Sequence, residues 1–169
     1  MISGRAWVFG DNINTDLIAP ARLLRRPVAE FSKFCMEPVM PAFAAEVKPG
    51  DVVVGGLNFG CGSSREQAPE AIKYLGVAAV VAKSFARTFY RNSMNIGLPA
   101  IVCADAGSIP QGARLRISLE KGVVEDLDGG KSYPCQAVPP HLMAMLNDGG
   151  LVEHLEKRLR AGVPGANQP

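Results

Sequence analysis

The side chains best suited to chemistry lie close together in residues 58–69, which read NFGCGSSREQAP. Ser63 and Ser64 offer hydroxyl groups, and Arg65 follows them directly. A guanidinium group can meet a carboxylate or a phosphate with two parallel N–H bonds. The glycines before the serines let the backbone approach a ligand closely or take up positive φ. These residue types in this order predict a loop that binds an anionic ligand.

The position of this loop permits two interpretations. It follows a predicted buried strand, residues 51–56, and precedes a predicted helix, so Ser63 and Ser64 are expected at a helix N-terminus. Ligands bind at the carboxyl ends of parallel strands, and free N–H groups at a helix N-terminus favour negative charge. The structural alternative is a serine N-cap, with Glu66 or Gln67 completing a capping box. The local pattern leaves both open.

The loop does not match the common phosphate and nucleophile motifs. No Lys-Ser or Lys-Thr pair follows its glycines, as it would in a Walker A loop. The G-x-G-x-x-G spacing of a dinucleotide-binding turn is absent, and so is the G-x-S-x-G pattern of a hydrolase elbow. An anion site of another kind remains as the functional prediction.

The cysteines do not form a metal-binding pattern. The chain has four, all widely spaced: Cys35, Cys61, Cys103 and Cys135. Metal and cluster sites within one chain normally contain at least one close pair such as C-x-x-C. We therefore expect no metal in this chain and mostly buried, reduced thiols.

Composition places the chain among soluble globular proteins. Its 169 residues suffice for one domain, and 47% of them are hydrophobic against 20% charged. A formal net charge of +2 gives no support for nucleic-acid binding. Residues 1–7 lack the pattern of a signal peptide, and the longest apolar stretch, residues 76–82, cannot span a bilayer. A cytoplasmic protein without membrane contact is expected.

The elements that must position the loop follow an α/β order. Four segments have the composition of strands: residues 5–9, 51–56, 77–82 and 98–103. Helical spacing marks three more: residues 27–35, 65–75 and 84–92. Strands that alternate with helices predict a parallel sheet with right-handed crossovers.

The last third of the chain has a different pattern. Period-two alternation and a Gly-rich turn at residues 128–130 predict antiparallel strands: residues 114–119, 122–127 and 131–135. Two helices are expected after them, at residues 140–147 and 151–160. The tail, residues 160–169, has no pattern and is expected to fray.

Three segments resemble, in the same order, the swivelling domain of the aconitase superfamily. The first is the loop at residues 58–69. The second is residues 9–22, FGDNINTDLIAPAR, and the third is residues 83–99, KSFARTFYRNSMNIGLP. The resemblance runs in register from about Trp7 to Cys103.

The resemblance implies an architecture and a partner. A single swivelling domain over residues 1–169 is expected, with three β/β/α layers and a mostly parallel central sheet. A domain of this kind that stands alone is similar to the small subunits of 3-isopropylmalate dehydratases and two-subunit homoaconitases. In those enzymes a large iron–sulfur subunit carries a [4Fe–4S] cluster, whose iron removes the substrate hydroxyl as a Lewis acid. This chain is expected to bind no cofactor itself.

The resemblance also implies roles within the loop. Ser63 is similar to the serine that acts as general base and takes a proton from the carbon beside a carboxylate. Ser64 and Arg65 are expected to hold a carboxylate of the substrate. The residues before them are expected to shape the loop: Gly60, Cys61 and Gly62.

The choice of substrate is expected to lie with residues 22–27, RLLRRP, where Arg25 and Arg26 are the candidate substrate-binding residues. Interconversion of 2-isopropylmalate and 3-isopropylmalate, as in leucine biosynthesis, is the first prediction. Leu23 stands where the family usually has an aromatic residue, and Gln67 where it usually has His. A homoaconitase or an enzyme for another substituted malate, such as 2,3-dimethylmalate, therefore remains open. A non-enzymatic anion-binding module is the third alternative, and it would tolerate Thr or Asn in place of the serine base.

The remaining polar candidates have structural interpretations. Asp11 and Asp16 are expected to hold turns through bonds to backbone N–H groups. His141 and His154 lie away from the three motifs and are expected to be ordinary surface or packing residues.

Overall fold

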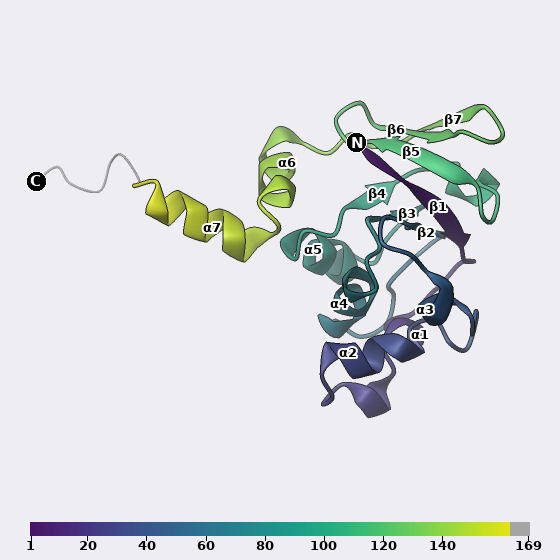
Figure 1. Ribbon diagram of the computed structural model, residues 1–169, viewed down its shortest axis with the longest axis horizontal. Helices are drawn as coiled ribbons and strands as arrows, with labels where there is room; N and C mark the ends of the chain where they lie inside the picture. The colour runs from purple at the N-terminus through teal and green to yellow at the C-terminus, as the bar shows by residue number, and fades with distance from the viewer. Residues whose placement is uncertain (163–169) are drawn as a thin grey trace, which may run out of the picture.

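The computed structural model describes residues 1–162, and the remainder of the expected frayed tail, residues 163–169, lies outside the described residues. One seven-stranded sheet has the order β4-β3-β2-β1-β5-β6-β7 (Figure 1). Its strands are β1 (Ile2–Val8), β2 (Val52–Gly55), β3 (Ala79–Ala82), β4 (Ala100–Val102), β5 (Arg114–Ser118), β6 (Val123–Asp126) and β7 (Lys131–Pro134). The predicted α/β class is confirmed.

The sheet is evenly mixed, so the prediction of a mostly parallel sheet is wrong. The pairs β1–β2, β2–β3 and β3–β4 are parallel, whereas β1–β5, β5–β6 and β6–β7 are antiparallel. Strand β1 joins the two halves, because Ile2–Arg5 pair with β5 while Ala6–Val8 pair with β2. The expected hairpin is therefore one end of the same continuous sheet.

Seven α-helices lie within residues 1–162, and none is long and apolar enough to cross a bilayer. They are α1 (Thr15–Ile18), α2 (Val28–Phe31), α3 (Phe43–Glu46), α4 (Gln67–Tyr74), α5 (Arg87–Asn95), α6 (Pro140–Asn147) and α7 (Leu151–Arg160). The last two match their predicted ranges. The short helices α1 and α3 were not predicted.

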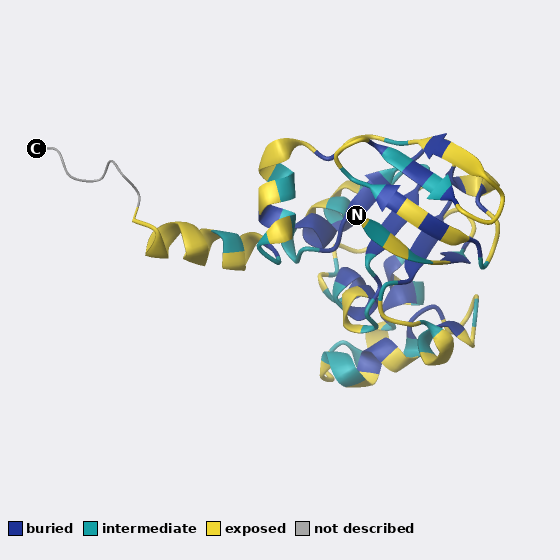
Figure 2. Cartoon of the chain, turned by 45° about the horizontal axis from the view of Figure 1, so that its top comes forward, coloured by how far each residue is buried: buried dark blue, intermediate teal, exposed yellow. Residues whose placement is uncertain are grey.

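The parallel strands are covered on both faces, as their valine runs predict. Val53 and Val80 pack with side chains from α1 to α5 in one core cluster. Val52, Val54 and Val81 point to the other face and pack with side chains from β5, β6 and β7 in a second cluster. Dark blue strands between the layers in Figure 2 mark this burial. The antiparallel half thus curls over the sheet face opposite the helices.

Candidate active site at the carboxyl end of the parallel strands

Three loops meet beyond the carboxyl ends of β1, β2 and β3. The amide of Gly60 donates to the Ile13 carbonyl at 2.7 Å, which joins the loop after β2 to the loop after β1. Phe59 pairs with residues 84 and 86 through two backbone bonds of 2.9 Å, which joins it to the segment after β3. Neighbouring parallel strands end at the same edge of a sheet, so the three segments of the family resemblance lie in contact.

Two glycines give the central loop its path. Gly60 has φ +76°, and a Cβ at this position would lie 2.2 Å from Cγ of Phe89. Gly62 has φ +100° and lies against Thr15, whose Oγ1 would be 3.3 Å from an added Cβ. Both positions favour glycine, because other residues rarely adopt these angles, and at position 60 the side chain of Phe89 also occupies the space. Between them, the carbonyl of Cys61 accepts the amide of Thr15 at 2.8 Å.

The serines do not cap the following helix, which corrects the prediction that they lie at its N-terminus. Helix α4 begins at Gln67, and its N-cap is Glu66, with no side-chain capping bond. A helix that began at Arg65 would need the amide of residue 69 to donate to the Arg65 carbonyl. Residue 69 is proline and has no N–H, so the first α-helical bond runs from Glu70 to Glu66. The capping-box alternative is therefore wrong as well.

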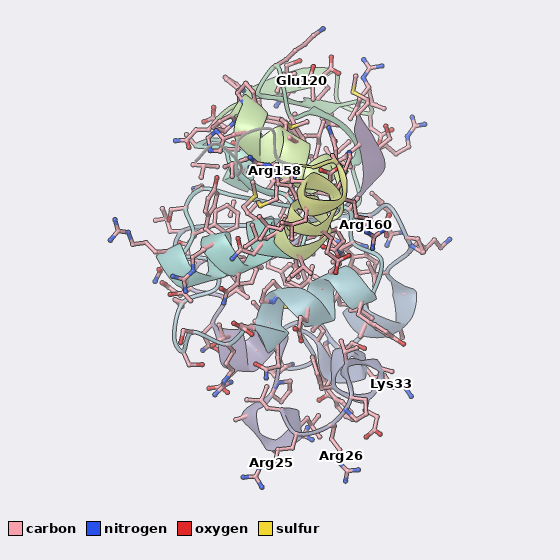
Figure 3. All side chains as sticks on the ribbon, turned by 90° about the vertical axis from the view of Figure 1, so that its left-hand side faces the viewer. Arg25, Arg26, Lys33, Glu120, Arg158 and Arg160 are labelled. Carbon is pink, nitrogen blue, oxygen red and sulfur yellow. The ribbon has the colours of Figure 1, made fainter. Side chains whose placement is uncertain are left out.

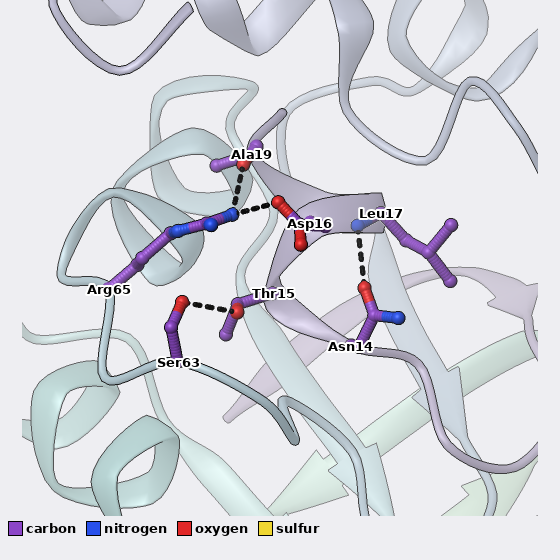
Figure 4. A network of polar contacts seen from close by, with 7 residues as sticks. All are labelled: Asn14, Thr15, Asp16, Leu17, Ala19, Ser63 and Arg65. Carbon is purple, nitrogen blue, oxygen red and sulfur yellow. Dashed lines mark hydrogen bonds and ion pairs between the residues drawn. The ribbon is translucent and has the colours of Figure 1, made fainter. Parts of the chain in front are cut away.

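The hydroxyl of Ser63 has a defined partner. Its Oγ lies 3.0 Å from Oγ1 of Thr15, the first residue of α1 (Figure 4). Thr15 is only 3% exposed, and Asn14 caps its helix by accepting the amide of Leu17 at 2.9 Å. Ser63 itself is exposed. A buried side chain thus orients the hydroxyl while its outer side stays open to a ligand.

Arg65 is held by the same short helix. Its Nη1 donates to the Asp16 carboxylate and to the Ala19 carbonyl, the latter at 3.3 Å (Figure 4). The Arg65 side chain is 18% exposed. Within residues 1–162, no hydrogen bond uses its Nε or Nη2. One edge of the guanidinium group, with two parallel donors, therefore has no acceptor among the described residues.

Asp11 and Asp16 have different roles, although both were expected to hold turns. Oδ1 of Asp11 accepts the amide of Leu57 at 2.7 Å, so it joins the loops after β1 and β2. Asp16 instead forms the ion pair with Arg65.

Backbone donors add to the positive character of the loop. In the described part of the chain, no hydrogen bond uses the amides of Ser63, Ser64 or Arg65. Together with the guanidinium edge, these donors suit an anion that approaches from outside the sheet edge.

The predicted specificity loop is residues 22–27, and residues 58–69 are called the serine loop below. Arg25 and Arg26 are exposed and point outward at the lower end of the molecule in Figure 3. Arg26 lies 3.7 Å from Glu30 in an exposed ion pair. Leu23 and Leu24 pack against the core under the helices. Among residues 1–162 no hydrogen bond or ion pair joins the two arginines to the serine loop.

Thr15 and Asp16 are site residues that the sequence reasoning did not find. The sequence contains one indication of their role. The polar run at residues 12–16 and the serine loop each follow a predicted strand, and these two strands are consecutive along the chain. Strand order is not readable from one sequence, so the pairing of these loops required the tertiary structure.

The four cysteines are free, and two of them, Cys103 and Cys135, lie in the same cluster. Cys35 lies in the core cluster under the helices and Cys103 in the cluster on the opposite face of the sheet. Burial raises the pKa of the Cys35 thiol far above its usual range, and burial, followed by the neighbouring Cys103, raises the pKa of Cys135 to about 11. The described residues contain no group of three His, Cys, Asp or Glu side chains placed to hold a metal ion.

Comparison with known proteins shows similarity over nearly the whole chain. The family model of the aconitase C-terminal domain matches residues 40–106. The "3-isopropylmalate dehydratase small subunit" of Nautilia profundicola is 47% identical over 95% of this chain and 97% of its own length. The "Methanogen homoaconitase small subunit" of Methanothermobacter thermautotrophicus is 46% identical over 98% and 96%.

A solved structure agrees with the fold. The crystal structure of 3-isopropylmalate dehydratase from Methanocaldococcus jannaschii superposes with a TM-score of 0.89 at 44% sequence identity, covering 95% of this chain and 96% of that one. This chain therefore belongs to the aconitase C-terminal domain family, in the group formed by the small subunits of 3-isopropylmalate dehydratase and its close relatives.

Proposed function

We propose that this chain is the small subunit of a hydro-lyase, 3-isopropylmalate dehydratase, which interconverts 2-isopropylmalate and 3-isopropylmalate in leucine biosynthesis. The observation that carries the proposal is the exposed Ser63 hydroxyl, held by Thr15 beside the open edge of Arg65. The similarity to small subunits over 95% or more of the chain supports it.

In this proposal Ser63 is the general base. A serine oxygen takes a proton from carbon only where its negative charge is stabilised. Thr15 can donate its hydroxyl hydrogen to that oxygen, since the two oxygens are 3.0 Å apart. The neighbouring backbone amides supply further donors without reorganisation of the loop.

Arg65 and Ser64 bind the carboxylate next to the reacting carbon. The free edge of the guanidinium group offers two parallel N–H donors, which fit the two oxygens of a carboxylate. The negative charge that remains on the carbon after the proton leaves is delocalised into that carboxylate. The contact of the carboxylate with Arg65 and Ser64 therefore strengthens as the reaction proceeds. Asp16 keeps the guanidinium in place through its Nη1.

The [4Fe–4S] cluster of such enzymes does not fit the cysteines of this chain. Cys35 and Cys103 are buried on opposite faces of the sheet, and the described residues contain no group of three His, Cys, Asp or Glu side chains placed to hold a metal ion. We therefore assign the cluster to a large-subunit partner, while Ser63 moves the proton and Arg65 holds the carboxylate.

In the same proposal, the chain forms a single three-layer swivelling domain. The enzyme is located in the cytoplasm. An exposed base on an open sheet edge suits a domain that closes over a substrate held by the partner.

A homoaconitase-type substrate is the second candidate, and one observation favours it. The leucines of residues 22–27 pack inward, so the outward part of this loop is Arg25 and Arg26. Exposed arginines suit a substrate with a further carboxylate better than one with a branched alkyl group. A related substituted malate, such as 2,3-dimethylmalate, is the third.

The test is turnover of the chain combined with the large subunit, on isopropylmalate, homoaconitate and dimethylmalate. Ser63→Ala should lower kcat by a factor of about 10²–10⁴ on the preferred substrate, the usual range for a general base. Ser132→Ala, an exposed serine on β7, is the matched control and should keep parent activity. No turnover of any of these acids by the parent complex would favour the anion-binding alternative.

The same panel tests the specificity loop. Replacing Arg25 and Arg26 by Ala should change the ratio of kcat/KM between substrates by a factor of roughly 10 to 150, because a charged hydrogen bond contributes about 1.5–3 kcal/mol. An equal fall for every substrate would show that this loop does not select among them.

A further inference from the structure

Helix α7 projects from the body of the protein and carries an uncovered apolar stripe. It extends sideways beyond α6 in Figure 1 and is almost entirely exposed in Figure 2. The stripe consists of Leu151, Val152, Leu155 and Leu159, which are 37%, 63%, 47% and 73% exposed. Apolar residues at this spacing normally face a core. Within residues 1–162 nothing covers the outer part of the stripe.

The stripe continues into a hollow on the body. Leu151 and Val152 line a cavity of about 230 Å³ together with Ile96 of the α5 C-cap. Ile96 also lines a neighbouring hollow of about 450 Å³, whose outer wall includes Tyr74, 55% exposed. A single apolar band thus runs from the body onto α7, and large connected apolar surfaces of this kind mark sites of association.

The acidic rim of this band has one nearby cation, Lys73, which lines the larger hollow with Glu70 but donates to the carbonyls of Ile96 and Gly149. Glu66 and Glu70 line the smaller hollow, and neither takes part in an ion pair within residues 1–162. Burial, followed by repulsion from Glu66, raises the pKa of Glu70. A positive group that a partner brings to this rim would pair with these carboxylates and would lower the pKa of Glu70 again.

Helix α7 carries positively charged groups in its last turn, at the end away from the hollow. Its first turn contains Glu153, whereas its last turn contains Lys157, Arg158 and Arg160. Lys157 pairs with Asp148, and Arg160 pairs with Glu156. Arg158 has no ion pair among the described residues, and it lies at the exposed surface of α7 in Figure 3.

We propose that this band is the contact between two copies of this chain, whose α7 helices pack antiparallel about a twofold axis near Leu155. An antiparallel pair sets the basic last turn of one helix beside the acidic first turn of the other. Arg158 of one protomer then faces the Glu66 and Glu70 rim of its partner. A parallel pair would place like charges together.

The size of the contact determines the expected strength. Ten helical residues extend only about 15 Å, so α7 alone buries less than the roughly 800 Å² per partner of a standard interface. The hollows beside it add area. We expect a reversible dimer that dissociates on dilution.

The experiment is sedimentation velocity of the full chain over loading concentrations from about 1 to about 200 μM, a range suited to an interface of this size. The parent should change from monomer to dimer across this range. The double variant Leu155→Glu/Leu159→Glu should stay monomeric with an unchanged circular dichroism spectrum, since both side chains are exposed and Glu favours helices. Leu127→Glu is the matched control, because Leu127 is 43% exposed and lies on the antiparallel half of the sheet; it should dimerise like the parent.

A second set of variants tests the pairing of Arg158 with the acidic rim. Arg158→Glu should weaken dimerisation at least tenfold, and adding Glu70→Arg to it should restore most of the loss. A parent that is monomeric throughout would overturn the proposal, and so would a dimer that Leu155→Glu/Leu159→Glu leaves intact. If the parent is monomeric and the double variant instead fails to bind the large subunit, the stripe belongs to that subunit. These readouts need no activity, so they are independent of the proposed reaction.

Discussion

Thr15 and Asp16 are neighbours on α1, and each holds one side chain of the serine loop. Thr15 contacts the Ser63 hydroxyl, and Asp16 contacts the Arg65 guanidinium. One short helix therefore sets the relative position of the proposed base and the proposed carboxylate clamp. Both contacts join residues 48 or 49 positions apart, so they depend on the approach of two loops.

The contact between Thr15 and Ser63 predicts an effect on rate. Thr15→Val keeps the shape of the side chain but removes the hydroxyl, so kcat of the complex should fall by roughly 2- to 10-fold, the equivalent of about 0.5–1.5 kcal/mol for one hydrogen bond. KM should stay near the parent value, because Thr15 does not reach the substrate. Thr15→Ser should recover the rate. A kcat that is the same for all three forms would show that Thr15 only packs.

The geometry of Arg65 predicts that Lys cannot replace it. An ammonium group is a point charge and cannot hold Asp16 while it presents two parallel donors to a carboxylate. Arg65→Lys should lower kcat/KM by a factor of roughly 10 to 150. Arg114→Lys, an exposed position on β5, should leave kcat/KM unchanged. Equal values for the Arg65 variant and the parent would argue against a two-bond clamp.

Among the elements, β1 joins the two halves of the sheet, because it pairs in parallel with β2 and antiparallel with β5. A buried carboxylate just before β2 secures it. Asp51 is 7% exposed and accepts from the amide of Arg5 at 3.0 Å, from Nε1 of Trp7 at 2.9 Å and from the amide of Lys48 at 3.0 Å. The joint between the parallel and antiparallel halves thus depends on one side chain.

Removal of this carboxylate should destabilise the whole domain. Asp51→Ala leaves buried donors without a partner, at a cost of about 1–3 kcal/mol each. We expect the free energy of unfolding in urea to fall by about 2–5 kcal/mol. Glu125→Ala, which removes the exposed partner of Arg116, should leave the urea midpoint nearly unchanged. A small effect of Asp51→Ala would mean that water satisfies the donors.

At the scale of the whole molecule, the proposed catalytic groups and the apolar stripe of α7 lie on different elements, although Glu66, which lines the hollow beside α7, follows Arg65 directly in the sequence. The serine loop lies beyond the carboxyl ends of the parallel strands, whereas the band follows α7 away from the body. The serine loop carries a base and a carboxylate clamp on an open edge. We therefore expect it to complete its site against the large subunit.

This division predicts the behaviour of the chain alone. Purified without oxygen and supplied with iron and sulfide, it should stay colourless and should not turn over isopropylmalate, because no three cysteines among the described residues are placed together to hold a cluster. The measurement is the visible spectrum together with an activity assay before and after the large subunit is added. A stable brown [4Fe–4S] chromophore on this chain alone would contradict the assignment of the cluster to the partner.

Much of the fold could be predicted from local sequence. Valine runs identified β2 and β3, the Gly-rich turn identified the hairpin of β6 and β7, and α6 and α7 have their predicted bounds. These features depend on residues close in the sequence. Helix α4 begins later than predicted, because Pro69 removes one N–H group whose effect reaches back to Arg65. The even mixture of strand directions was missed, because nothing local shows that β1 pairs with β5.

The candidate site divides in the same way. The sequence by itself determined the family and the residue types of the serine loop, because these depend on short motifs. The contact with Phe89 that excludes a side chain at position 60 is a property of the tertiary structure. Only the tertiary structure decided that Thr15 holds Ser63, that Asp16 holds Arg65 and that neither serine caps α4. It also decided that Arg25 and Arg26 point outward at the surface and that α7 leaves its leucines uncovered. The physical reason is that strand order brings distant loops into contact, and a single sequence does not contain that order in readable form.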